Sequence, residues 1–261
     1  MSEPLFRPMT SNDIEEALAI IHDHDEDDYA WATVTYESSL MGQYVLELDS
    51  QVIGVTGAVS IPETDRAYEI SWTYLTRAFI GRRYGRTMLE NLIEQLRSEG
   101  CRKAFVNTSN YYDPEDGDIY RDAREAYRTV GFLEEMRHAD FYAAGENLIS
   151  YGLRLENRGP HHQHDLNSGS IRLTEVEEIP ECDGAYYLAW ELNGEESDVS
   201  DFTSIADQVR DLGGRVIFMA FPSDVEHATE LMNRCRFRKD GVLLDYFEDG
   251  TDEVHFRYDI R

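Results

Sequence analysis

Two hydrophobic periods alternate along the first 155 residues of the chain. Period-two alternation and short apolar runs predict strands, whereas apolar positions three and four residues apart predict helices. Because strand and helix signals follow one another, we predict an α/β fold, a mixed and twisted sheet with helices on both faces. The expected strands cover residues 5–9, 44–48, 52–61, 67–75, 103–108, 141–142 and 148–155, and the expected helices cover 14–21, 88–96 and 119–129.

A polar segment rich in Gly, Pro and Ser interrupts this pattern at residues 156–170 and shows neither hydrophobic period. Such a composition is typical of a linker between folded domains. The sequence therefore predicts a first domain over residues 1–155 and a second, smaller domain over residues 171–261.

The second domain repeats part of the first. The stretch Gln95–Gly100 matches Gln208–Gly213 at an offset of 113 residues, and Phe132, Asp140–Tyr142 and Gly145 have matches 105 residues further on. The two offsets differ by eight, the length of the acidic segment 111–118. The second domain is therefore predicted to be a truncated copy that lacks this segment and is shorter at its front.

The charge balance is strongly acidic, because 52 Asp and Glu stand against 24 Lys and Arg. A net charge of −28 repels nucleic acid and anionic membranes, so neither is expected as a partner. Salt screens the self-repulsion of such a surface. This favours adaptation to a salty cytoplasm over the alternative, an acidic ligand-binding role.

Apolar runs, the N-terminal residues and the cysteines indicate the cellular location. No run of 18 apolar residues predicts a membrane-spanning helix, and Met1–Pro4 begins no secretory signal. The three cysteines, Cys101, Cys182 and Cys235, are far apart and odd in number. Neither a disulfide framework nor a zinc site is indicated, so a reducing cytoplasm is expected.

Two motifs point to a known family. The stretch Arg124–Phe132 reads R-E-A-Y-R-T-V-G-F, and Asp140–Glu146 reads D-F-Y-A-A-G-E. They resemble the R-x-F-Y-x-x-x-G-F and D-F-Y-x-x-G-D patterns of the GNAT superfamily of N-acetyltransferases. The strand Tyr68–Leu75 and the segment Ile80–Gly85 stand where that family places its central strand and its pyrophosphate loop. The resemblance covers residues 4–155 and implies the GNAT fold, with a degenerate partial copy in residues 171–261.

The resemblance implies acetyl-CoA as co-substrate. Its pyrophosphate needs backbone N–H groups that converge at a helix N-terminus. Its pantetheine arm pairs with a strand edge, which the family opens around Leu75 and Asn107, and the N–H near Leu75 polarises the thioester carbonyl. The expected cofactor-binding residues are Leu75, Gly81, Arg82, Arg83, Tyr84, Gly85, Arg86 and Asn107.

The implied chemistry is attack of a neutral amine on a thioester. An amine with a pKa of about 10 must lose a proton, and Glu69 is the candidate base. The departing thiolate needs a proton, and the resemblance assigns this general-acid role to Tyr127. No cysteine has a His and Asp pattern that favours a covalent acetyl-enzyme. The sequence thus predicts an N-acetyltransferase that acts on a small-molecule or protein amine by direct transfer in a ternary complex.

The loop departs from the family pattern Gln/Arg-x-x-Gly-x-Gly/Ala, because Ile80 and Arg83 occupy its first and middle positions. A second register, Arg82-x-x-Gly85-x-Thr87, recovers two positions after a two-residue shift. These departures motivate an alternative, a non-catalytic acyl-CoA-binding sensor or scaffold. Another alternative is an acyltransferase for a longer acyl group or a hydroxyl acceptor. In the second domain Met232 replaces Tyr127 and no phosphate loop exists, so that domain is expected to be inert.

The candidate residues also have structural interpretations. Tyr127 fits the core side of an amphipathic helix, and Glu69 fits the exposed face of a strand. Arg86 and the two preceding arginines fit a solvated helix start paired with Glu90. The acidic run His22–Asp28 either attracts a cationic acceptor or is a surface adapted to salt, and the second interpretation is favoured.

Metal and partners are the remaining expectations. His161, His162 and His164 lie in the predicted linker, a poor scaffold for a defined site, so no metal is expected. Exposed strand edges make a homodimer plausible.

Overall fold

The computed structural model describes residues 3–115, 117–157, 159 and 168–260, which form two compact units. The first consists of Met1–Val106, Asp122–Leu133 and Gly152–Asn157, and the second of Asn107–Arg121, Glu134–Tyr151 and Arg158–Arg261. Two strands, β5 (Lys103–Ser109) and β9 (Glu146–Arg154), therefore each have residues in both units. None of the helices in the described ranges is long and apolar enough to cross a membrane.

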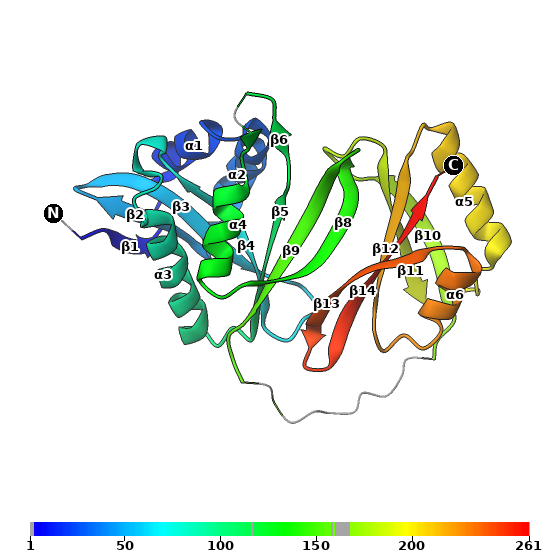
Figure 1. Ribbon diagram of the computed structural model, residues 1–261. Coiled ribbons are helices and arrows are strands. Elements are labelled where there is room, and N and C mark those ends of the chain that lie inside the picture. The colour runs from blue at the N-terminus through cyan, green and yellow to red at the C-terminus, as the bar shows by residue number, and fades with distance from the viewer. Residues whose placement is uncertain (1–2, 116, 158, 160–167, 261) are drawn as a thin grey trace. The chain divides into compact units, whose positions relative to one another are not determined.

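A seven-stranded sheet has the order β1-β2-β3-β4-β5-β9-β8 (Figure 1). Its strands from β1 to β4 pair antiparallel and β4 pairs parallel with β5, so the sheet is mixed, as predicted. The last two strands are longer than predicted. Besides β5 and β9, the strands are β1 (Leu5–Pro8), β2 (Gln43–Leu48), β3 (Gln51–Ser60), β4 (Ala67–Leu75) and β8 (Leu133–Ala143).

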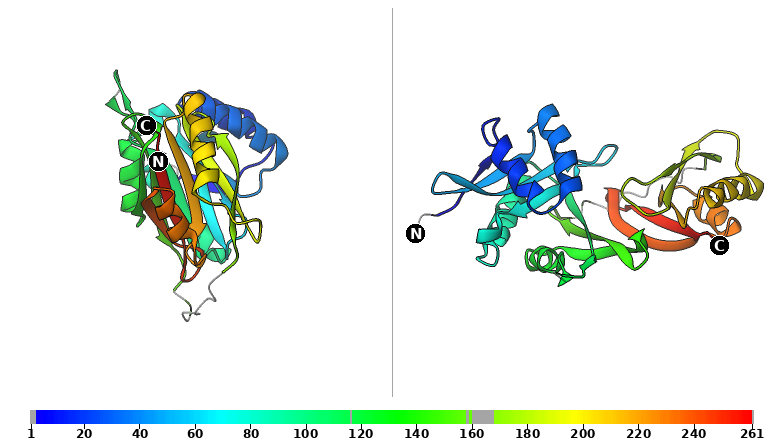
Figure 2. Two further views of the ribbon diagram at one scale, coloured as in Figure 1. Left: turned by 90° about the vertical axis from the view of Figure 1, so that its right-hand side faces the viewer. Right: turned by 90° about the horizontal axis from the view of Figure 1, so that it is seen from above.

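Helices cover both faces of this sheet in the first unit, as predicted. Figure 2 shows α1 (Ile14–His22) and α2 (Glu26–Ser38) on one face and α3 (Tyr84–Ser98) and α4 (Arg121–Thr129) on the other. Helix α2 was not predicted.

The reason α2 escaped prediction is that its apolar residues form no stripe. Ala32 and Tyr36 are buried, whereas Trp31 and Val34 are exposed. The start of this helix nevertheless had a local signal. The Asp25 carboxylate accepts the backbone N–H groups of Asp27 and Asp28, as a helix N-cap does.

The acidic segment before α4 forms a hairpin rather than the start of the helix. Strands β6 (Tyr112–Asp113) and β7 (Gly117–Asp118) pair with each other, so α4 begins at Arg121 and not at residue 119. The predicted helix was therefore two residues too long at its start.

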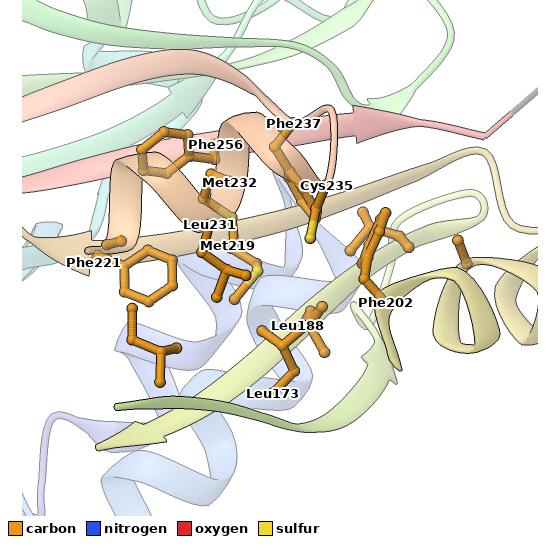
Figure 3. Close-up of a cluster of buried hydrophobic side chains, with 14 of the residues drawn as sticks. Leu173, Leu188, Phe202, Met219, Phe221, Leu231, Met232, Cys235, Phe237 and Phe256 are labelled. Carbon is orange, nitrogen blue, oxygen red and sulfur yellow. The ribbon is translucent and has the colours of Figure 1, made fainter. Parts of the chain in front are cut away.

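A second sheet belongs entirely to the second unit and has the order β10-β11-β12-β14-β13. Helices α5 (Val199–Asp211) and α6 (Ala228–Arg234) pack on one apolar core with this sheet (Figure 3). The core includes Leu188 and Met232, which are both fully buried. The strands are β10 (Ile171–Glu178), β11 (Ala185–Leu192), β12 (Val216–Pro222), β13 (Arg238–Glu248) and β14 (Thr251–Asp259).

Local geometry recurs between the halves of the chain at the offsets found in the sequence. Strands β4 and β5 share three parallel residue pairs, and β11 and β12 share three. Three hydrogen bonds also have counterparts. The bond from Cys101 N to Leu96 O corresponds to the bond from Gly214 N to Val209 O. The bond from Phe132 N to Tyr127 O corresponds to the bond from Phe237 N to Met232 O. The bond from Gly145 N to Asp140 Oδ1 corresponds to the bond from Gly250 N to Asp245 Oδ1.

Candidate functional site

The site is built around the end of β4 and one tyrosine of α4. Tyr127 is buried, and its ring meets Phe132 edge-on with the centroids 5.9 Å apart. Burial raises the pKa of the Tyr127 phenol to about 12; a hydrogen bond with the Thr73 side chain acts in the opposite direction, and the negative charge of Asp28 adds to the rise. Tyr127 is therefore a protonated phenol at neutral pH, which can donate a proton.

Thr73 is placed by a bulge in β4 that the sequence did not reveal. Val55 of β3 pairs with Tyr74, but Gly57 pairs with Ser71, so Trp72 and Thr73 together oppose the single residue Thr56. The hydroxyls of Thr56 and Thr73 are 2.9 Å apart.

The bulge decides which side chains face which helices. Trp72 and Tyr74 pack with the core of α1 and α2, whereas Leu75 packs with Met88 of α3. Thr73, which lies between Trp72 and Tyr74, therefore faces the side of α3 and α4, where it meets Tyr127.

The other face of β4 is held by the segment that joins α1 to α2. The His24 Nε2–H donates to the Leu75 carbonyl oxygen at 2.7 Å, and the His24 ring stacks on Tyr74 with the centroids 5.1 Å apart. The Tyr74 hydroxyl donates to Asp28 Oδ2 at 2.5 Å. These three contacts hold the end of β4 against the α1–α2 segment, and the sequence predicted none of them.

Strands β4 and β5 pair over only a short length. Their parallel pairing joins Ala67–Glu69 to Lys103–Phe105, and no further β4–β5 pair occurs in the described part of the chain. Leu75 lies six residues beyond the last pair. The β4 backbone at Leu75 is thus a strand edge. Because its carbonyl oxygen already accepts the His24 Nε2–H, the Leu75 N–H is the group that this edge offers to an extended, peptide-like ligand.

The predicted pyrophosphate loop leads into α3 but is shorter than predicted, because the helix begins at Tyr84 and includes Gly85 and Arg86. A short 3-10 helix, Arg77–Phe79, is followed by Gly81 and then by Arg83, both with a left-handed backbone, φ +76° and +70°. Arg83 is the N-cap residue of α3 and makes no side-chain capping bond. The left-handed region favours glycine, and a side chain there costs about 1–2 kcal/mol. Arg83 therefore holds a backbone conformation that a glycine adopts at lower cost.

The other loop residues surround this helix start. The guanidinium of Arg82 lies over the Phe79 ring, 5.6 Å from its centroid, and Tyr84 contacts the same ring edge-on. A Cβ on Gly85 would meet the Leu75 side chain at 3.4 Å, so the loop lies close to the end of β4. Arg86 pairs with Glu90 at 2.8 Å on the exposed side of the helix, as its structural interpretation expected.

Two predicted site residues, Glu69 and Asn107, are positioned by other contacts. Glu69 pairs with Val59, and alternation along β3 and β4 places it on the face of α1 and α2, whereas Tyr127 meets Thr73 on the opposite face. The structure therefore does not bring Glu69 and Tyr127 together. Asn107 belongs to the second unit, where its amide oxygen accepts the Ser150 hydroxyl at 2.6 Å.

Cysteine and metal chemistry have no evident site. Burial raises the pKa of the Cys101 thiol to about 12 and the pKa values of Cys182 and Cys235 to about 11, which makes all three thiols unreactive at neutral pH. No group of three or more His, Cys, Asp or Glu residues is arranged for a metal ion within the described ranges. His161, His162 and His164 lie outside the described residues.

Comparison with known proteins gives the class of this domain. Residues 8–116 match the model of the acetyltransferase (GNAT) family, the family that the motifs at residues 124–132 and 140–146 resemble. A GNAT-family protein of Desulfovibrio desulfuricans has the same fold with a TM-score of 0.53 and 21% identity, over 59% of this chain and all of that one. No curated protein matches the sequence.

Two other solved structures are similar at lower scores. An N-acetyltransferase of Staphylococcus aureus has a TM-score of 0.49 and 16% identity, over 59% of this chain and all of that one. A Salmonella typhimurium protein solved with its cofactor acetyl-CoA has a TM-score of 0.47 and 17% identity, over 62% of this chain and 99% of that one.

Proposed function

We propose that this protein transfers the acetyl group of acetyl-CoA directly to an amine within a ternary complex. The observation that carries the proposal is the buried Tyr127 hydroxyl, which bonds Thr73 two residues before Leu75, at the strand edge beyond the β4–β5 pairs. A thioester carbonyl bonded to the Leu75 N–H would place its sulfur on the Tyr127 side. The oxygen then receives a backbone hydrogen bond as charge develops on it, and the departing sulfur receives the phenol proton.

The start of α3 fits the pyrophosphate of the co-substrate. The first N–H groups of a helix point out of its N-terminus, and here they follow Arg83 in a local cluster of three arginines on an otherwise acidic chain. Gly81 contributes room, since a Cβ added there would meet no atom within 4 Å. Arg82 and Arg83 would hold the phosphates, and Arg86 would do so on leaving Glu90.

Replacing Arg82 by Gln is expected to weaken acetyl-CoA binding about tenfold or more, because a hydrogen bond to a charged group contributes about 1.5–3 kcal/mol. Binding of S-acetyl-pantetheine, which has no pyrophosphate, is expected to stay unchanged. Calorimetric titration of both ligands measures this. Arg97→Gln, in the last turn of the same helix, is the matched control. Equal weakening of the two ligands would contradict the phosphate role.

The proposed function is tested by calorimetric titration of acetyl-CoA in molar potassium chloride, followed by an assay of CoA release with spermidine, tyramine and a tripeptide with a free α-amine. One saturable site per chain and amine-dependent release are expected. A folded protein that binds neither acetyl-CoA nor CoA would rule the proposal out. Binding without release for any amine would favour the sensor or scaffold, to which the arginine at position 83 also points.

The second domain is proposed to be a degenerate partial copy without catalytic function. Beyond the three β11–β12 pairs, the Trp190 Nε1–H donates to the Ala220 carbonyl oxygen at 2.8 Å, so an indole bridges the strands that correspond to β4 and β5. Met232, in place of Tyr127, is fully buried. We also propose that the domains span residues 1–155 and 171–261, that the protein works in a salty cytoplasm, and that it forms a homodimer.

A further inference from the structure

The reaction needs a proton acceptor for the amine as well as a proton donor for the sulfur. Glu69 lies within the β4–β5 pairing, six residues before Leu75, whereas the acceptor is needed at the end of β4. One carboxylate does lie close enough for its charge to act on the Tyr127 hydroxyl, and it belongs to Asp28. Asp28 is a residue of the first turn of α2, on the face of β4 opposite to α4. We propose that Asp28 is the general base that takes the proton of the attacking amine; this rests on the proposed function.

One direct contact and two indirect contacts hold Asp28 in place. The Tyr74 hydroxyl of β4 donates to Asp28 Oδ2 at 2.5 Å. The Asp28 backbone N–H is bound by the Asp25 carboxylate, which holds the first turn of α2 in place. His24, from the segment before α2, stacks on Tyr74 and donates to the Leu75 carbonyl oxygen. The ionisable groups around Asp28 thus include Asp25 at the start of α2, Tyr74 of β4, Tyr127 of α4 and, through Tyr74, His24.

The placement suits the chemistry because base and acid act from opposite faces of β4. Thr73 and Tyr127 meet on the face of α3 and α4, whereas Tyr74 and Asp28 meet on the face of α1 and α2. An amine that arrives from the α2 side meets Asp28, and a sulfur that leaves on the α4 side meets Tyr127. Tyr74 is a positioning residue, since it acts only by orienting Asp28.

The step balances in atoms and charge. The amine nitrogen forms a bond to the thioester carbonyl carbon, and its proton passes to the Asp28 carboxylate. The carbon–sulfur bond then breaks, and the sulfur takes its electron pair and the proton of the Tyr127 hydroxyl. The products are the amide and the free thiol of CoA. Asp28 then holds one extra proton and Tyr127 lacks one, and solvent returns the proton between them.

The experiment compares kcat and KM from pH 7 to pH 9.5 for the wild type, Asp28→Asn, Asp28→Glu and Tyr74→Phe. The amine is the one with the fastest CoA release among spermidine, tyramine and the tripeptide. Asp28→Asn is expected to lower kcat about 10²-fold at pH 7 and to leave acetyl-CoA affinity within about twofold. The deficit is expected to shrink as the pH rises, because hydroxide replaces the missing base. Asp28→Glu is expected to restore part of the rate, and Tyr74→Phe to show a smaller deficit with the same pH trend.

Asp27→Asn is the matched control, since it removes the same charge from an exposed position in the same helix turn. It is expected to keep full activity. A wild type without turnover for any amine would refute the proposed function itself. If the wild type is active, three results would each overturn the role of Asp28 alone. These are an Asp28→Asn rate above half that of the wild type, an Asp28→Asn deficit that does not change with pH, and an equal loss of rate in Asp27→Asn.

Discussion

Replacing Tyr127 by Phe is expected to lower kcat about 10²- to 10⁴-fold, the range in which a positioned proton donor contributes. Acetyl-CoA affinity is expected to stay within about twofold, because the phenyl ring keeps its edge-on contact with Phe132. Steady-state CoA release and calorimetric titration of the same variant separate these two effects.

The raised pKa of Tyr127 sets the pH dependence of this step. With a pKa of about 12, above the ordinary value of 10, the phenol stays protonated through pH 10, so its ionisation is not expected to reduce kcat below that pH. Burial also opposes the thiolate. A departing sulfur that is screened from water is more basic than a solvated thiolate, which favours transfer of the phenol proton to it.

Tyr36→Phe is the control for this substitution. Tyr36 is also buried, and its hydroxyl has no hydrogen-bond partner within the described residues, so its removal is expected to leave kcat unchanged. A Tyr127→Phe variant with more than a tenth of the wild-type kcat would show that Tyr127 is a core tyrosine rather than the proton donor.

Replacing Leu188 by Ala is expected to lower the free energy of unfolding of the second unit by about 2–5 kcal/mol. Leu188 lies on β11 inside the core beneath α5 and α6, with no exposed surface, and its truncation leaves a cavity (Figure 3). Urea unfolding in molar potassium chloride measures the change, followed by the fluorescence of Trp190 in a background in which Trp31 and Trp72 are replaced by Phe.

Leu212→Ala is the matched control, because this leucine is 63% exposed. Its effect is expected to stay within about 0.5 kcal/mol. A Leu188→Ala loss below about 1 kcal/mol would contradict a core that packs to native density. Acetyl-CoA affinity of the Leu188→Ala variant, measured well below its unfolding transition, is expected to equal that of the wild type if only the first domain binds the co-substrate.

Local patterns were enough for most of the fold. Strand β4 was predicted with its observed bounds, and the helix that closes before Gly100 was found from its apolar stripe, because periodicity and a left-handed C-terminal glycine are local properties. Helix α2 could not be found from an apolar stripe, because its exposed face includes Trp31 and Val34. Its start could have been found from Asp25 and the acidic turn after it.

The residues of the candidate site likewise fall into those that the sequence identifies and those that only the folded chain brings together. The motif around Tyr127 and the turn before α3 could be identified from the sequence, because their chemistry lies within a few consecutive residues. Asp28, Thr73 and His24 could not, because each matters through a partner that only the folded chain brings near. The bulge at Trp72 is the clearest case, since it turns Glu69 to one face and Thr73 to the other. The sequence by itself thus determined most of the elements, the resemblance to the GNAT family and the candidate proton donor. Tertiary packing decided which side chains lie near that tyrosine, because one extra residue in a strand inverts the alternation of every side chain beyond it.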